Sequence, residues 1–220
     1  MIGRTLPVQV LTLRLIPNIS PGLSKALGIS NQYRAIGLIS TDSDDMTYMA
    51  LDEATKVANV EVVYGRSFYA GAANASTALA GEVIGILAGP TPAEVASGLR
   101  GAEAFLNSGA GFRTANEEES VVYLAHCVSR TGSYLAHLAN VPVGQALAYL
   151  IAPPVEAIEG LDAAMKASDV EMVQFFEPPT ETNFCGGLLT GTQSACQAAC
   201  DAFAQRVREI AARPKDLGGM

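Results

Sequence analysis

Apolar residues occur along the chain in short runs separated by polar and glycine-rich stretches, and this pattern predicts a mixed α/β fold. Runs rich in Val, Ile and Leu between turn-forming residues are typical of strands, whereas apolar residues spaced three and four apart are typical of helices. Strands are predicted at residues 7–16, 33–41, 60–68, 81–88, 120–128, 145–152, 170–176 and 186–191. Helices are predicted at residues 21–27, 49–58, 92–106, 131–139, 156–167 and 193–212.

An internal repeat relates the two halves of the chain. The segment Asp52–Val63 (DEATKVANVEVV) matches Asp162–Val173 (DAAMKASDVEMV) at an offset of 110 residues, with six of twelve positions identical. A weaker match at offset 111 relates Ala35–Ile39 to Ala146–Leu150. Because the longer match runs through helix, turn and strand in order, it favours a duplication over chance similarity between two alanine-rich helices.

The duplication predicts two small α/β domains, one at residues 1–112 and one at residues 113–220, with the polar stretch 107–119 between them. After the third strand of each domain comes a loop, Tyr69–Ala80 in the first and Glu177–Gly187 in the second. Loops of this length can be passive turns or can carry function.

Composition and charge exclude several functions. The chain has 14 basic and 22 acidic residues, a net charge of -8, so it lacks the basic footprint of a nucleic-acid-binding protein. No run approaches the roughly 20 apolar residues of a membrane helix, so no membrane partner is expected. Charged residues make up only 16%, against roughly 25% in typical soluble domains. We interpret this as a surface largely covered in an assembly.

The cysteines give no sign of a disulfide framework or a zinc site. They are unpaired in their spacing, and the chain has only two histidines. A reducing, cytosolic compartment fits this usage best. The four residues are Cys127, Cys185, Cys196 and Cys200.

Three aspartates after the second predicted strand are the first candidate for chemistry. Asp42, Asp44 and Asp45 can coordinate a divalent metal, hold an ammonium group or form an exposed acidic turn. Asp52 and Glu53 also lie close together, but at the start of a predicted helix, where the dipole alone favours acids. No nucleophile–base motif or phosphate-binding glycine loop is present.

Several longer strings resemble bacterial microcompartment shell proteins, in particular the ethanolamine-utilisation shell proteins of the EutL type. Besides the repeat itself, they are Gly37–Tyr48, Val63–Ala72, Val128–Leu135, Tyr149–Pro154 and Pro178–Asn183. The resemblance covers nearly the whole chain. It implies two tandem, circularly permuted shell domains of α+β type, each an antiparallel-rich sheet flanked by helices. It also implies a homotrimer with six-fold pseudo-symmetry that tiles a shell together with other shell proteins in the cytoplasm.

The same resemblance implies pores and their ligand. Each subunit is expected to bind ethanolamine in a small pore, with carboxylates attracting the ammonium, a phenyl ring facing the cation and a threonine contacting the hydroxyl. The matching residues are Asp44, Asp45, Glu82, Phe112, Thr180 and Thr182. Arg66, Tyr69 and Asn183 are expected in pore loops. No cofactor is required, a divalent metal or cobalamin in the central pore is compatible with the family, and no metal ligands are assigned.

Three hypotheses follow. The first is a structural shell protein, not an enzyme, whose gated pores pass substrate or cofactors and whose closed form ethanolamine favours. The second is a metal-dependent enzyme built on Asp42, Asp44 and Asp45, which predicts stoichiometric metal and turnover. The third is a stand-alone small-molecule sensor, which does not pack into sheets. The repeat favours the first and third hypotheses over the second, the low charge favours the first, and the strings that resemble shell proteins decide for the first.

Overall fold

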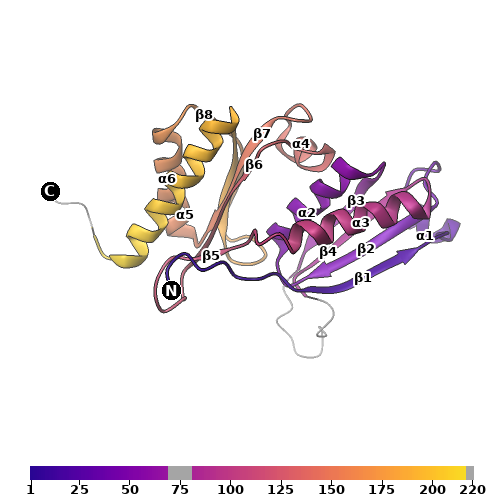
Figure 1. Cartoon of the computed structure of the whole chain (residues 1–220), viewed down its shortest axis with the longest axis horizontal. Coiled ribbons are helices and arrows are strands. Elements are labelled where there is room, and N and C mark those ends of the chain that lie inside the picture. The colour runs from indigo at the N-terminus through magenta and orange to yellow at the C-terminus, as the bar shows by residue number, and fades with distance from the viewer. Residues whose placement is uncertain (69–80, 217–220) are drawn as a thin grey trace. The chain divides into compact units, whose positions relative to one another are not determined.

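The computed structural model describes residues 1–68 and 81–216, which form two compact units (Figure 1). The first, here called the acidic unit, consists, within the described residues, of 7–68, 81–110 and 132–135. The second, here called the threonine unit, consists, within the described residues, of 1–6, 111–131 and 136–216. Two short segments, residues 1–6 and 132–135, are thus grouped with parts of the chain that are distant from them in the sequence.

The acidic unit is a four-stranded antiparallel sheet with strand order β1-β2-β4-β3. Two long helices, α2 and α3, pack on each other and on the sheet (Figure 1). The elements are β1 (Val10–Ile16), α1 (Pro21–Ala26), β2 (Ala35–Thr41), α2 (Asp44–Val57), β3 (Glu61–Ser67), β4 (Val83–Gly89) and α3 (Pro92–Leu106).

The threonine unit repeats this arrangement with strand order β6-β7-β9-β8, to which the two-residue strand β5 adds at the β6 edge. Helices α5 and α6 pack together and against the sheet. The elements are β5 (Arg113–Thr114), β6 (Val122–Val128), α4 (Ser133–Ala139), β7 (Ala146–Ala152), α5 (Pro154–Ala167), β8 (Val170–Phe176), β9 (Cys185–Gly191) and α6 (Gln193–Ala212). The first residues of α4 belong to the acidic unit.

The duplication is confirmed by the topology. Strands and helices follow one another in the same order in both copies, and the middle strands occupy the same places in the two sheets. Even an irregularity repeats, because the pairing register shifts between Val62 and Tyr64 in β3 and between Met172 and Gln174 in β8, 110 residues later. The prediction of antiparallel-rich sheets flanked by helices is therefore confirmed.

The predicted elements are all present, with one displaced boundary that matters for function. Helix α2 begins at Asp44 rather than near residue 49, so Asp44 and Asp45 form its first turn. Acidic residues are favoured there by the helix dipole. The Thr41 hydroxyl closes the preceding turn, since it accepts from the Ser43 amide at 3.0 Å and lies 2.7 Å from the Thr47 hydroxyl.

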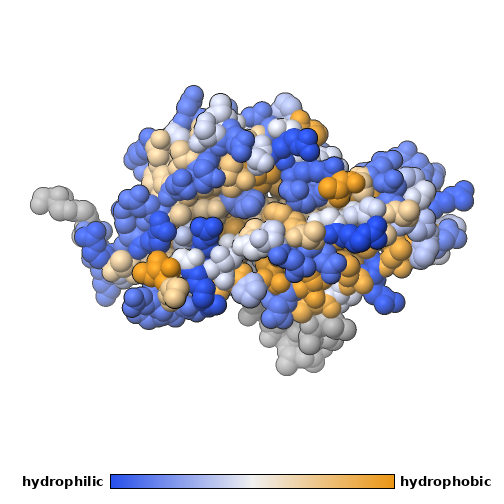
Figure 2. Space-filling model, in the orientation of Figure 1, coloured by the Kyte–Doolittle hydropathy of each residue, from blue (hydrophilic) through white to orange (hydrophobic). Residues whose placement is uncertain are grey.

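Each sheet has an apolar core beneath its long helices, and the acidic unit has a second cluster of buried isoleucines centred on Ile36 and Ile86. Figure 2 shows apolar surface gathered along part of the acidic unit, between patches of hydrophilic residues. Within residues 1–68 and 81–216, no helix has both the length and the apolar character needed to cross a membrane.

Candidate functional site

Three strand ends meet at one end of the sheet in the acidic unit. Thr41, the last residue of β2, pairs with Val83, the first residue of β4. Ser67, the last residue of β3, pairs with Val83 from the other side. Side chains that follow β2, precede β4 or end β3 are therefore brought together, although they are far apart in the sequence.

Asp44 and Asp45 lie at this junction, and each is only 7% exposed. The Asp44 carboxylate accepts from the Ser67 hydroxyl at 2.8 Å and from the Asp45 amide at 2.8 Å. The interpretation of these two residues as an exposed acidic turn is therefore wrong. Asp42 is exposed, and its carboxylate accepts from the Gln9 amide at 2.8 Å.

Glu82 reaches the same junction from β4. Its backbone amide donates to the Thr41 carbonyl at 2.9 Å, and its carbonyl accepts from the Phe68 amide at 2.9 Å. Partial burial of the Glu82 carboxyl group, and then the negative charges of Asp44 and Asp42, raise its pKa above 4.5. The carboxylates are thus close enough to repel one another, and a cation placed among them would relieve this repulsion.

Two of the predicted pore-loop residues are Arg66, which lies in β3, and Tyr69, which follows β3 in the sequence. Arg66 is exposed on β3, with its guanidinium carbon 6.0 Å from the centre of the Tyr64 ring. Burial raises the pKa of the nearby Tyr134 to about 12, and the positive charge of Arg66 opposes this rise. Tyr69 lies outside the described residues.

The other three predicted ligand residues lie in the threonine unit, at the corresponding end of its sheet. Phe112 packs on Phe184, the residue before β9, with ring centres 5.5 Å apart. The Thr180 hydroxyl accepts from the Phe184 amide at 3.1 Å and lies 3.4 Å from the Thr182 hydroxyl. Asn183 adopts a left-handed backbone (φ 64°), and its amide donates to the Thr180 carbonyl at 3.0 Å.

The structure therefore assembles the six predicted residues into two groups of three, one carboxylate-rich and one of threonines with an aromatic ring. The start of the helix differs between the two copies, because α5 begins with Pro154 and Val155 where α2 begins with Asp44 and Asp45. Charge is thus concentrated in one copy, while hydroxyl groups and a ring face are concentrated in the other.

Sequence reasoning missed the role of Asp52. The residue lies in the middle of α2 rather than at a helix start, and it is fully buried. Its carboxylate accepts from the amides of Gly132 (2.7 Å) and Leu135 (2.8 Å) and pairs with Lys56 at 3.1 Å. The counterpart pair, Asp162 and Lys166, is exposed. The same two residue types four apart thus occur in both copies, so the pattern alone gives no signal of burial.

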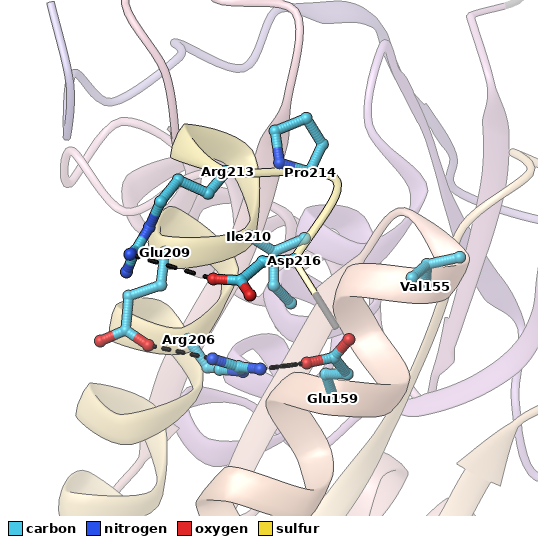
Figure 3. Close-up of a pocket in the computed structure, with 8 residues that line it drawn as sticks. All are labelled: Val155, Glu159, Arg206, Glu209, Ile210, Arg213, Pro214 and Asp216. Atoms are coloured by element: carbon cyan, nitrogen blue, oxygen red, sulfur yellow. Dashed lines mark hydrogen bonds and ion pairs between the residues drawn. The ribbon is translucent and has the colours of Figure 1, made fainter. Parts of the chain in front are cut away.

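A hollow of about 140 Å³ lies between α5 and the C-terminal end of α6 (Figure 3). Arg206 points across it to Glu159, with its Nε 3.0 Å from the carboxylate, and also pairs with Glu209 at 3.3 Å. Arg213 and Asp216 approach to 3.9 Å at its rim. The charges inside this hollow are paired with one another, and none of the predicted ligand residues lines it.

The described part of the chain holds no group of three His, Cys, Asp or Glu side chains arranged as metal ligands. The four cysteines are free thiols, three of them buried, and burial raises the pKa of the Cys196 thiol to about 11. A divalent metal or cobalamin in the pore stays a prediction from the resemblance.

Comparison with known proteins identifies the family. Residues 35–115 match the BMC domain. The chain is 62% identical over 206 residues to the bacterial microcompartment shell protein EutL of Clostridium perfringens, an alignment that covers 94% of this chain and 95% of the relative. The corresponding protein of Escherichia coli is 50% identical, with 94% of each chain covered.

The fold agrees with the sequence comparison. The crystal structure of the ethanolamine utilization protein EutL from Leptotrichia buccalis superposes with a TM-score of 0.94 and 59% identity, covering 98% of this chain and 100% of that one. These relatives are shell proteins rather than enzymes, and they give no support to the metal-dependent enzyme or the stand-alone sensor. The chain belongs to the EutL family of bacterial microcompartment shell proteins.

Proposed function

We propose that the protein forms a homotrimeric, pseudohexameric tile in the shell of an ethanolamine-utilisation microcompartment, beside other shell proteins. The duplicated fold supports this, since three copies of a two-domain chain give a ring of six similar domains. The low share of charged residues, 16%, suits a tile that contacts neighbours on every edge.

The proposed ligand of the tile is ethanolamine, and the observation that carries this proposal is the carboxylate cluster of the acidic unit. Asp44 and Asp45 are buried at a helix start, and Glu82 carries a raised pKa caused partly by the Asp44 charge. A primary ammonium bound here is stabilised by charge-assisted hydrogen bonds. Such binding can bias pore opening only if the open and closed forms differ in affinity for ethanolamine.

Replacing Asp45 with alanine is expected to weaken ethanolamine binding by about tenfold or more, because a hydrogen bond to a charged group contributes about 1.5–3 kcal/mol. Isothermal titration calorimetry of wild type and Asp45→Ala measures this directly. The exposed Asp201 on α6 gives a matched control, and Asp201→Ala should leave affinity unchanged. Equal affinity in wild type and Asp45→Ala would contradict the site.

Ligand analogues in the same calorimetric experiment measure the separate contributions of the ammonium and the hydroxyl group to affinity. Ethylamine keeps the ammonium and should bind more weakly than ethanolamine, while ethylene glycol lacks the charge and should not bind at the acidic cluster. Thr180→Val and Thr182→Val remove one hydroxyl each. The variant that makes ethanolamine no better a ligand than ethylamine identifies the threonine that contacts the substrate hydroxyl.

Ethanolamine affinity is expected to fall as the pH is lowered through the pKa of Glu82. The sign follows from the chemistry, because the ammonium binds the carboxylate form and a raised pKa keeps Glu82 protonated to a higher pH than an ordinary glutamate. Titrations in steps downward from neutral pH should show the decline. Glu82→Gln should bind more weakly at neutral pH with a flatter profile, and an unchanged profile would show that Glu82 does not contact the ligand.

A further inference from the structure

The two copies of the repeat differ in what covers one helix face, and this difference points to a subunit interface. Helices α2 and α5 have the same length and are related by an offset of 110 residues. Asp45, Tyr48, Asp52 and Thr55 of α2 therefore correspond to Val155, Ile158, Asp162 and Met165 of α5.

In α2 this face is occupied by residues 132–135, which lie in the same compact unit. The Tyr48 ring packs on the Tyr134 ring with centres 6.3 Å apart. The Thr55 hydroxyl accepts from the Ser133 amide at 3.0 Å, next to the two amides held by Asp52. Leu135 is fully buried as a result.

Among residues 1–68 and 81–216, the equivalent face of α5 is left largely uncovered. Val155 is 64% exposed, Ile158 53% and Met165 39%, and together they form an apolar stripe along one side of the helix. The Asp162 side chain is 60% exposed between them. Exposed apolar side chains gathered on one helix face are typical of a protein–protein contact.

The missing partner of this face is present elsewhere in the chain, in helix α1. Helix α1 begins five residues after β1 ends, as α4 begins five residues after β6 ends, so Leu23 is the counterpart of Leu135. Leu23 is 43% exposed, and α1 contributes no buried residue. The contact between the start of α4 and the face of α2 is thus formed within the chain. The two equivalent surfaces, on α1 and on α5, are both exposed.

We propose that helix α1 of one protomer, through Leu23, covers the Ile158 face of α5 in a second copy of this chain. The contact is head-to-tail, since the two surfaces differ, and such a contact closes into a ring when the rotation permits. In the proposed homotrimer, two kinds of equivalent contact then follow one another around the ring. The contact of α4 with α2 lies within a chain, and the contact of α1 with α5 lies between two chains. This interface rests on the proposed homotrimer and assigns its surfaces.

The test is the absolute mass of three proteins in solution by light scattering. Wild type is expected near three times 22.9 kDa, and Leu23→Glu and Ile158→Glu are each expected at the monomer mass, because either change places a charge in every interface. Val143→Glu, at a 67% exposed position on neither face, should keep the wild-type mass. Circular dichroism checks the fold, and Leu23→Ser and Ile158→Ser replace any variant that fails to fold.

The outcomes separate the interface from the tile. If wild type is trimeric and Leu23→Glu stays trimeric, the assigned interface is wrong while the tile proposal stands. Dissociation by Ile158→Glu alone would also overturn the assignment, since α5 would then contact another surface. A monomeric wild type would overturn the interface and the homotrimer together.

Discussion

Replacing Asp52 with alanine is expected to lower the free energy of unfolding by about 3–5 kcal/mol, because removing one partner of a buried ion pair leaves the other groups uncompensated. Three groups lose their acceptor at once. They are the amides of Gly132 and Leu135 and the ammonium of Lys56, which keeps its pair with Glu53 at 2.6 Å. An unsatisfied buried amide alone costs about 1–3 kcal/mol.

Urea denaturation followed by circular dichroism measures this loss. Asp201→Ala, at an exposed position on α6 where the side chain accepts from Gln197, should change the free energy of unfolding by less than about 1 kcal/mol. A similarly small loss for Asp52→Ala would show that the amides of residues 132–135 are satisfied without Asp52. It would also weaken the comparison between α2 and α5 from which the interface is inferred.

The fold was largely predictable because each copy has a strong local pattern. β7 is apolar and buried at every position from Ala146 to Ala152, and Pro92 marks the start of α3. Because the two halves are repeats, the elements predicted in one half also predict those of the other. The start of α2 was not predictable from apolar periodicity, because its first turn, at Asp44 and Asp45, is acidic and looks like a loop.

The sequence alone indicated Asp44 and Asp45, but the rest of the candidate site was predicted only through family resemblance, since its residues come from strand ends that the sequence separates. Asp44 and Glu82 become neighbours only because β2 and β4 are adjacent in the sheet, which no local pattern encodes. Burial was equally hidden. Asp52 and Asp162 have the same residue type and the same lysine four positions on, yet tertiary packing buries the first and leaves the second exposed.

Gly81 is the second position where a small change should have a large effect, because it sets the backbone that places Glu82. Its φ of +62° lies in the left-handed region, and a Cβ added there would overlap the carbonyl oxygen of Thr41. That carbonyl accepts from the Glu82 amide at 2.9 Å. Gly81→Ala should therefore lower the free energy of unfolding by about 2–4 kcal/mol, from backbone strain and steric overlap together.

Gly109 separates these two contributions. Its φ of +87° is also unfavourable for alanine, but a Cβ there meets nothing within 4 Å. Gly109→Ala should cost only the strain, about 1–2 kcal/mol, and leave ethanolamine affinity unchanged. Gly81→Ala should lose both stability and affinity, since relief of the overlap moves Glu82 away from Asp44. Equal losses of stability in the two variants, with full ethanolamine affinity in both, would mean that the position of Glu82 does not depend on Gly81 and that the cluster tolerates movement of this strand end.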